Sequence, residues 1–331
     1  MTRTPIDARR IAATRLAARS LLLASLVAPA MPSIAQNYPS KPIRMLVGFP
    51  PGGGTDVVAR ILSPKLSQSL GTIVVDNRAG ASGTIATEIA AKAAPDGYTM
   101  FLGTLGNLSV NPLLFKQLPF DISRDFAPLM QVVNVTFVLY AHPSLPSKTV
   151  SEFIALAKSR PINYASSGNA GTPHLAAELF NAMARIRMTH VPYKGGGPAF
   201  AALMGGQIDV FFSNIPVGLQ HVRSGRLRAI AVLTPKRSPV MPDIPTVGES
   251  LPGYEILNWF GMVLPAGTPR AILSRLHAEI TRALRDPEVT ARLLELGAEP
   301  VGSSPNDFGA FTKSETAKWA KLIREADIRA D

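Results

Sequence analysis

The chain has 331 residues, of which 46% are hydrophobic and 17% charged, with no cysteine and a formal net charge of +11. A chain of this length is too long for one ordinary hydrophobic core, so we expect a soluble globular protein of two domains. The lack of cysteine excludes a disulfide scaffold, a thiolate zinc site and a cysteine nucleophile. Basic residues occur singly or in pairs without interleaved aromatics, so no nucleic-acid partner is indicated. A mildly basic surface suits an acidic small molecule, although general solubility is the simpler cause.

The N-terminal segment has the pattern of a secretory signal peptide. Five arginines and one aspartate precede an apolar stretch at 21–32, and Ser33-Ile34-Ala35 then forms a small-x-small cleavage pattern. The apolar stretch is shorter than the roughly 20 residues of a membrane span, which disfavours an uncleaved anchor. We expect removal of residues 1–35, with its five arginines and one aspartate, to lower the net charge from +11 to +7 in the mature protein. Ordinary secretion is favoured, with twin-arginine export, suggested by Arg9-Arg10, as the alternative.

Strand-like and helical runs then alternate, which is typical of βαβ units around a parallel sheet. Apolar residues within 57–70 recur at three- and four-residue steps and end at Gly71, as in an amphipathic helix. The first predicted elements are strands at 43–49, 72–77 and 99–104 and helices at 57–70 and 82–93, the second helix capped by Ser82.

The alternation changes at residues 125–143, a long apolar extended stretch that we interpret as a crossing into a second domain. A proline- and glycine-rich segment at 242–255 fits the crossing back, so both chain ends build the first domain. The predicted domains are the signal peptide 1–35, a discontinuous first lobe at 36–140 and 250–331, and a second lobe at 141–249. The remaining predicted elements are helices at 150–158, 173–185, 198–204, 269–285, 287–296 and within 306–326, and strands at 162–166, 189–193, 209–213, 227–233 and 256–264.

The turn at residues 50–56 is the strongest local signal, because a strand, three glycines and a helix start follow one another directly. Such a turn leaves backbone N–H groups at a helix N-terminus, which is a site for an anion; a tight connection without a ligand is the alternative. No lysine follows the glycines, which excludes a phosphate loop, and a dinucleotide fingerprint lacks its third glycine. Asp56 repels a pyrophosphate and is expected to accept backbone N–H groups, which orders the loop for a single carboxylate.

Polar loops of small residues follow further predicted strands at 77–83, 104–109 and 166–174, where open α/β sheets bind ligands. Thr172 is a candidate cap, with Pro173 at the first helical position. For four charged or titratable side chains a ligand contact and an ordinary structural role both stay open: Arg78, His174, Lys194 and Asp209. The five histidines lack metal-ligand spacing and no catalytic motif is present, so we expect no catalytic residue, metal or cofactor.

Eight segments in this order make the mature sequence resemble the Bug family of periplasmic solute receptors, which serve tripartite tricarboxylate transporters. They are YPSKPI at 38–43, FPPGGGTD at 49–56, NRAGASG at 77–83, PDGYT at 95–99, VPYKG at 191–195, GGQID at 205–209, PDIPTVGE at 242–249 and WFG at 259–261. The resemblance implies a two-lobed α/β periplasmic binding protein of the Venus-flytrap, type II-like class. Each lobe is then a mixed, mostly parallel sheet flanked by helices.

The resemblance also implies a function: a small organic anion is captured between the lobes and delivered to a membrane permease, with the receptor acting as a monomer. In the family the ligand carboxylate is held largely by backbone groups and waters, and many members lack a basic side chain there, so Arg78 is not carried over. The implied ligand-binding residues are Phe49, Pro50, Gly53, Gly54, Thr55, Thr104, Asn107, Ser166, Ser167, Gly168, Gly171, Thr172 and, nearby, Asp209.

Two other functions remain open from the sequence. One is a secreted enzyme acting on a small carboxylate, with His174 or Asp209 as general acid or base. The other is a ligand-sensing subunit that reports to a membrane partner instead of feeding a transporter. Binding without turnover distinguishes the receptor from the enzyme.

Overall fold

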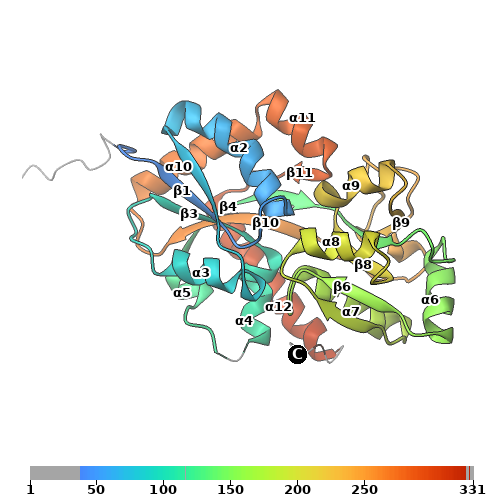
Figure 1. The fold of residues 1–331 in the computed structure, drawn as a ribbon. Helices are drawn as coiled ribbons and strands as arrows, with labels where there is room; N and C mark the ends of the chain where they lie inside the picture. The colour runs from blue at the N-terminus through green and yellow to red at the C-terminus, as the bar shows by residue number, and fades with distance from the viewer. Residues whose placement is uncertain (1–37, 116, 326–327, 329–331) are drawn as a thin grey trace, which may run out of the picture. The chain divides into compact units, whose positions relative to one another are not determined.

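The computed structural model describes residues 38–115, 117–325 and 328 (Figure 1). The predicted signal peptide, residues 1–35, lies outside the described residues. Two β-sheets with their helices account for the described part, and we call them the first and the second lobe. Within it, no helix is both long enough and apolar enough to cross a membrane.

The first lobe is built on a six-stranded sheet in the order β11-β4-β10-β3-β1-β2. Helices α2 and α10 lie side by side against this sheet (Figure 1). Its strands are β1 (Ile43–Val47), β2 (Ile73–Asn77), β3 (Thr99–Thr104), β4 (Phe126–Val135), β10 (Asn258–Pro265) and β11 (Ala298–Pro300). Its helices are α2 (Gly54–Leu70), η2 (Ala81–Gly83), α3 (Thr84–Ala91), η3 (Gly106–Val110), α4 (Asn111–Leu114), α5 (Ile122–Asp125), α10 (Arg270–Leu284), α11 (Pro287–Glu295) and α12 (Pro305–Glu325).

The second lobe is built on a five-stranded sheet in the order β7-β6-β8-β5-β9. Its strands are β5 (Phe137–Ala141), β6 (Asn163–Ser166), β7 (Thr189–Pro192), β8 (Val210–Asn214) and β9 (Arg228–Val232). Its helices are α6 (Val150–Ser159), α7 (Thr172–Ala184), α8 (Gly196–Met204) and α9 (Ile215–Arg223), and the short η4 (Val247–Glu249) follows β9 along the chain.

The chain changes sheets twice. The first change falls at Thr136, between β4 and β5, and precedes the predicted boundary at residue 140 because β5 pairs with β8 and β9. The return runs between β9 and β10. The two crossings are hydrogen-bonded to each other, since Leu233 N donates to Phe137 O at 2.8 Å and Ile256 N donates to Leu233 O at 2.8 Å. The assignment of 36–140, 141–249 and 250–331 to separate domains stays a prediction.

The mixed character of both sheets follows from these crossings. Strands β1, β2 and β3 are parallel, as are β6, β7 and β8. Strand β10 returns antiparallel to β3 and β4, and β5 enters the second sheet antiparallel to β8 and β9. Antiparallel pairs therefore make up a larger share of the strand pairs than the predicted, mostly parallel sheets would contain.

Several helix starts differ from their predictions. The predicted helix at 82–93 begins with the separate turn η2, in which Ser82 has φ of 53° and does not cap α3. Its hydroxyl instead donates to Asn169 O in the second lobe. Thr172 is the first residue of α7, capped by Gly171 without a side-chain bond. Helix α9 was not predicted, because Gly218 interrupts its short apolar run.

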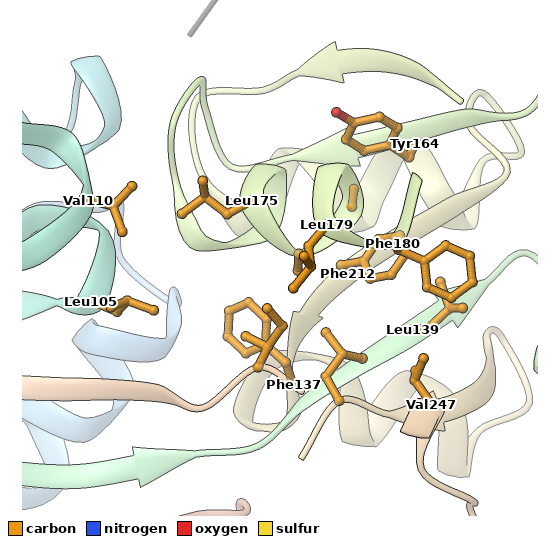
Figure 2. Close-up of a cluster of buried hydrophobic side chains, with 14 of the residues drawn as sticks. Leu105, Val110, Phe137, Leu139, Tyr164, Leu175, Leu179, Phe180, Phe212 and Val247 are labelled. Carbon is orange, nitrogen blue, oxygen red and sulfur yellow. The ribbon is translucent and has the colours of Figure 1, made fainter. Parts of the chain in front are cut away.

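The hydrophobic core runs along both lobes. Figure 2 shows Leu175, Leu179 and Phe180 of α7 gathered with Phe137 and Phe212 of the second sheet, and these side chains are at most 5% exposed. Burial on this scale removes apolar surface from water, which is the main stabilising term of the fold. It also holds α7 rigidly, so the position of its first turn is set by packing.

Candidate functional site

The turn between β1 and α2 has the order that the sequence predicts. Gly52 N donates to Asp56 Oδ2 at 2.8 Å, and the same carboxylate accepts from Arg60 Nε and Asn77 Nδ2 at 3.0 Å. Burial raises the pKa of Asp56, but these hydrogen bonds and the charge of Arg60 outweigh burial and place that pKa below its ordinary value. The prediction that Asp56 orders this loop is confirmed. The Asp56 carboxylate therefore makes its hydrogen bonds within the protein.

Four helices begin around one cavity between the lobes. The first turns of α2, α7, α8 and α9 contribute to its wall, and none of these helices has a side-chain hydrogen bond at its cap. Each helix start leaves N–H groups without intrahelical partners and carries about half a positive charge from the helix dipole. The lining is Phe49, Gly53, Gly54, Thr55, Thr104, Phe137, Ser167, Thr172, Pro173, Gly196, Ser213, Asn214, Val217, Asn258 and Phe260.

The cavity combines apolar and polar residues, and none of its described lining residues is charged. Among the residues described, its lining includes no Lys, Arg, Asp or Glu. Three buried side-chain oxygens in this lining have no hydrogen-bond partner: Thr55 Oγ1, Asn214 Oδ1 and Asn258 Oδ1. Buried polar atoms are normally paired, so three orphans at one place indicate a ligand surface. The volume of this cavity is about 40 Å³, which is room for about three water molecules.

Asn107, a predicted ligand residue, holds the neighbouring loops together instead. Its Oδ1 accepts from Thr104 N at 3.1 Å and from Thr104 Oγ1 at 3.0 Å, while its Nδ2 donates to Ser82 O at 2.7 Å. The side-chain amide is therefore used within the protein. Asn107 positions Thr104, which does line the cavity.

A second, larger chamber of about 270 Å³ adjoins the first, and Phe49 and Ser167 line both. Its wall combines small residues with three aromatic side chains and one cationic residue, Lys194. The lining is Gly48, Phe49, Pro50, Ala79, Gly80, Ala81, Ser82, Gly83, Phe115, Ser167, Gly168, Asn169, Tyr193, Lys194 and Gly195. The predicted residues Pro50 and Gly168 thus face this chamber.

Close approaches between the lobes explain several glycines. A Cβ on Gly195, whose φ is +112°, would lie 2.7 Å from the Pro50 ring, and one on Gly54 would lie 2.6 Å from Asn214 Nδ2. A Cβ on Gly168, whose φ is +134°, would lie 2.6 Å from Ser82 Oγ. Glycine is required where backbone conformation and contact with the opposite lobe both exclude a side chain.

His174 lies beneath the cavity as a structural residue. It is 2% exposed, stacks on His190 with ring centroids 4.1 Å apart, and its Nδ1 accepts from Ala170 N at 3.1 Å. Burial, followed by the nearby His190, lowers the pKa of His174 to about 3, so the ring is neutral at physiological pH. Ser166, another predicted ligand residue, pairs with His190 Nε2 at 2.6 Å and donates to Gly168 O at 3.0 Å.

Asp209 is placed at the wrong end of its strand for a ligand contact. It precedes β8, and its carboxylate accepts from Arg160 Nη2 at 3.0 Å and from Asn163 N at 2.8 Å. Asn214, at the other end of β8, lines the cavity. Five residue steps of extended chain place it roughly 16 Å from Asp209. Gly171 acts as the backbone cap of α7, and Arg78 pairs with Asp76 at 2.9 Å.

Eight lining residues of the first cavity were missed from the sequence. Asn214 could have been found, because an Asn followed two residues later by proline marks a helix start, as Gly171 and Pro173 do for α7. No local sequence pattern marks Asn258 and Phe260 as site residues, because they reach the cavity only through the place of β10 between β3 and β4 in the sheet. The missed residues are Phe137, Pro173, Gly196, Ser213, Asn214, Val217, Asn258 and Phe260.

Two sheets joined by two crossings, with helix N-termini meeting in a cavity between them, define a two-lobed solute-binding protein. Solved structures of this class match over most of the chain. R. palustris Rpa4515 with adipate gives a TM-score of 0.86 at 36% identity, covering 88% of this chain and 99% of that one. MatC from Rhodopseudomonas palustris with bound malate gives 0.83 at 33% identity, covering 86% and 100%.

Residues 58–328 match the family described as the tripartite tricarboxylate transporter family receptor. Protein BugT of Bordetella pertussis is 38% identical over 321 residues, covering 96% of this chain and 98% of that protein. The chain therefore belongs to this family of periplasmic transporter receptors, and the Bug-family resemblance is confirmed. It is a solute-binding receptor for small organic anions.

Proposed function

We propose that this receptor takes the carboxylate end of its ligand into the cavity of four helix N-termini and the remainder into the second chamber. The observation that carries the proposal is the uncharged, uncapped lining, in which the positive potential comes from helix ends. At about 0.3–1 kcal/mol each, four ends supply about 1–4 kcal/mol, which corresponds to roughly a 10-fold to 1000-fold preference for an anion. The adipate and malate held by the two similar structures fit a carboxylate ligand.

Binding is coupled to closure of the lobes in this proposal. The contacts of Pro50 with Gly195 and of Ser82 with Asn169 join the lobes in the wall of the second chamber. A ligand that touches both lobes binds the closed form more tightly and shifts the population towards it. The hinge motion is assigned to the hydrogen-bonded crossings at Phe137 and Leu233.

The receptor acts without catalysis, as a periplasmic monomer released from its signal peptide at residue 35, and hands the ligand to the transporter's permease. The positions of His174 and Asp209 support a receptor over an enzyme, because neither lines the cavity and both are bonded within the protein. N-terminal sequencing and light scattering of the exported protein test the cleavage and the monomeric state.

Calorimetry with carboxylates and their uncharged amides tests the function. The panel contains succinate, adipate, citrate and benzoate, each beside its amide, and product formation is followed by mass spectrometry. We expect one equivalent of at least one acid to bind, its amide to bind at least tenfold more weakly, and no product to form. Equal binding of acids and amides, or turnover of an acid, contradicts the proposal.

A further inference from the structure

The positive charge of the chain is concentrated in the second lobe. Residues 137–249 contain eleven Lys and Arg against five Asp and Glu, a net charge of +6. The expected mature chain carries +7, so the rest of it contributes only +1. General solubility requires no such division, because charge spread over both lobes would serve it equally well.

The second sheet has two distinct ends. Strands β6, β7, β8 and β9 all begin at one end, because β6 is parallel to β7 and β8, and β5 is antiparallel to β8 and β9. The cavity lies at the other end, where β8 finishes at Asn214 and α7 begins. Helix α7 connects the end of β6 to the start of β7, and α9 does the same for β8 and β9, so both helices finish where the strands begin. We call this the far end of the second lobe.

Exposed basic residues gather at the far end. Three of them lie in or directly after the last turn of a helix, and two lie in the loops that lead into β7 and β9. Among the residues that the structure describes, none of the five forms an ion pair. Asp209, the acidic residue at these strand starts, pairs with Arg160 at 3.0 Å instead. The five basic residues are Lys158, Arg185, Arg187, Arg223 and Arg226.

Helix C-termini account for part of this set. The C-terminus of a helix carries a partial negative charge that a cation stabilises, which suits Lys158, Arg185 and Arg223. Arg187 and Arg226 each lie three residues past the last residue of a helix, where that stabilisation has fallen off. A structural role therefore explains three of the five residues and leaves two.

We propose that the far end of the second lobe docks on an anionic phospholipid bilayer. Four strand spacings of about 4.8 Å separate the starts of β7 and β9, so the basic residues extend over roughly 19 Å. Unpaired Lys and Arg side chains spread in this way can each reach a different lipid phosphate. A single acidic peptide would meet only a few of them. A receptor of a membrane transporter also works beside such a bilayer.

Docking through the far end leaves the ligand site free. The cavity lies beyond the opposite end of β8, which is roughly 16 Å of strand away. Attachment therefore concentrates the receptor at the membrane without covering the cleft. Each Lys or Arg close to an anionic bilayer strengthens binding about fivefold, and salt screens this attraction.

Co-sedimentation of the exported protein with lipid vesicles tests the inference. The anionic vesicles contain phosphatidylethanolamine and phosphatidylglycerol at about 3:1, and phosphatidylcholine vesicles are the reference without net charge. We expect binding to the anionic vesicles at about 50 mM NaCl, at least tenfold weaker binding to the reference, and loss of binding at about 500 mM NaCl. Binding only to membranes that contain the permease identifies a protein partner and overturns the proposal. So does equal binding to both kinds of vesicle.

Two variants that lose the same charge locate the contact. The far-end variant replaces four of the basic residues: Arg185→Gln, Arg187→Gln, Arg223→Gln and Arg226→Gln. The control replaces four exposed arginines of α10, α11 and the turn between them, which form no ion pair among the described residues: Arg270→Gln, Arg275→Gln, Arg285→Gln and Arg292→Gln. We expect at least 50-fold weaker vesicle binding for the far-end variant and less than threefold for the control. An equal loss in both shows that net charge alone governs binding, which overturns the assignment.

A double variant separates docking from helix stability. Arg187→Gln with Arg226→Gln changes no helical residue, so the melting temperature should stay the same while vesicle binding falls about 25-fold. Unchanged vesicle binding by this variant contradicts the proposal. Because the far end is separate from the cavity, that result leaves the proposed carboxylate site standing.

Discussion

Helices that begin at the cavity and helices that begin elsewhere are capped in different ways. At the remote α6, Thr149 accepts from Glu152 N at 3.2 Å, and at α11, Asp286 accepts from Val289 N at 3.2 Å. At the cavity, Gly53, Gly171 and Gly195 provide no side chain at the caps of α2, α7 and α8, and Asn214 turns its side chain away from α9. Helices α3, α4 and α10 also start without a side-chain cap bond, although they do not begin at this cavity.

The cavity helices lack the stabilisation that a capping side chain contributes. An Asp, Ser, Thr or Asn cap typically contributes about 1 kcal/mol to stability by satisfying one N–H group. A glycine cap costs only about a few tenths of a kcal/mol relative to these residues, and it leaves the N–H groups for a ligand. The first turns of the cavity helices therefore lack the hydrogen-bond acceptor that a capping side chain gives the remote helices. In our proposal the ligand carboxylate is that acceptor.

The largest expected effect comes from Gly195→Ala at the cap of α8. The new Cβ would meet Pro50 at 2.7 Å across the cleft, at a φ of +112° that side chains rarely adopt. We expect at least a 100-fold rise in Kd by calorimetry because closure is blocked. Gly197→Ala is the control, since a Cβ there meets open space. Normal binding by Gly195→Ala shows that the lobes do not close at this contact.

Thr55→Pro tests whether an N–H group at α2 holds the ligand. Proline is tolerated in the first turn, as Pro173 in α7 and Pro216 in α9 demonstrate, but it deletes the N–H group. Loss of one hydrogen bond to a charged group costs about 1.5–3 kcal/mol, so Kd should rise roughly 10-fold to 100-fold. The matched change Ser151→Pro, at the second residue of α6, should leave Kd unchanged. Similar Kd values for both variants contradict the role of this helix start.

Gly171→Asp gives α7, which begins at the cavity, a capping side chain like those of α6 and α11. The cap residue has φ of −70° and ψ of 162°, which suits aspartate, and the carboxylate then occupies the α7 start. We expect the unfolding free energy to rise by up to about 1 kcal/mol and carboxylate affinity to fall about tenfold. Gly171→Asn controls for size without charge. Denaturant unfolding measures the free energy of unfolding, and calorimetry measures the carboxylate affinity. Unchanged affinity in Gly171→Asp would show that the capping side chain and the ligand do not compete.

Thr149→Ala should have the smallest effect on binding. Removing this cap lowers the unfolding free energy by about 0.5–2 kcal/mol, while Kd stays unchanged because α6 begins away from the cavity. Urea unfolding and calorimetry on the same sample measure both quantities. A parallel loss of affinity means that the remote and cavity helix starts are energetically coupled.

Much of the fold was predictable because its signals are local. The strand, glycine turn and helix start around Gly53 and Thr55 follow from spacing and backbone freedom, and α6 and β9 lie where periodicity predicts them. The predicted site residues that line the cavity are Phe49, Gly53, Gly54, Thr55, Thr104, Ser167 and Thr172. Asp209 lies outside this lining, because it precedes β8 and the cavity lies beyond the carboxyl end of that strand.

By itself the sequence determined most of the strand and helix segments, the glycine turn before α2 and the family that the chain resembles, because these depend on neighbouring residues. The tertiary structure alone decided which helix starts meet. Asn214 and Asn258 come from strands far apart in the chain, and they share a cavity because β8 lies beside β5 and β10 returns between β3 and β4. Sheet order depends on long-range packing, which no local pattern encodes.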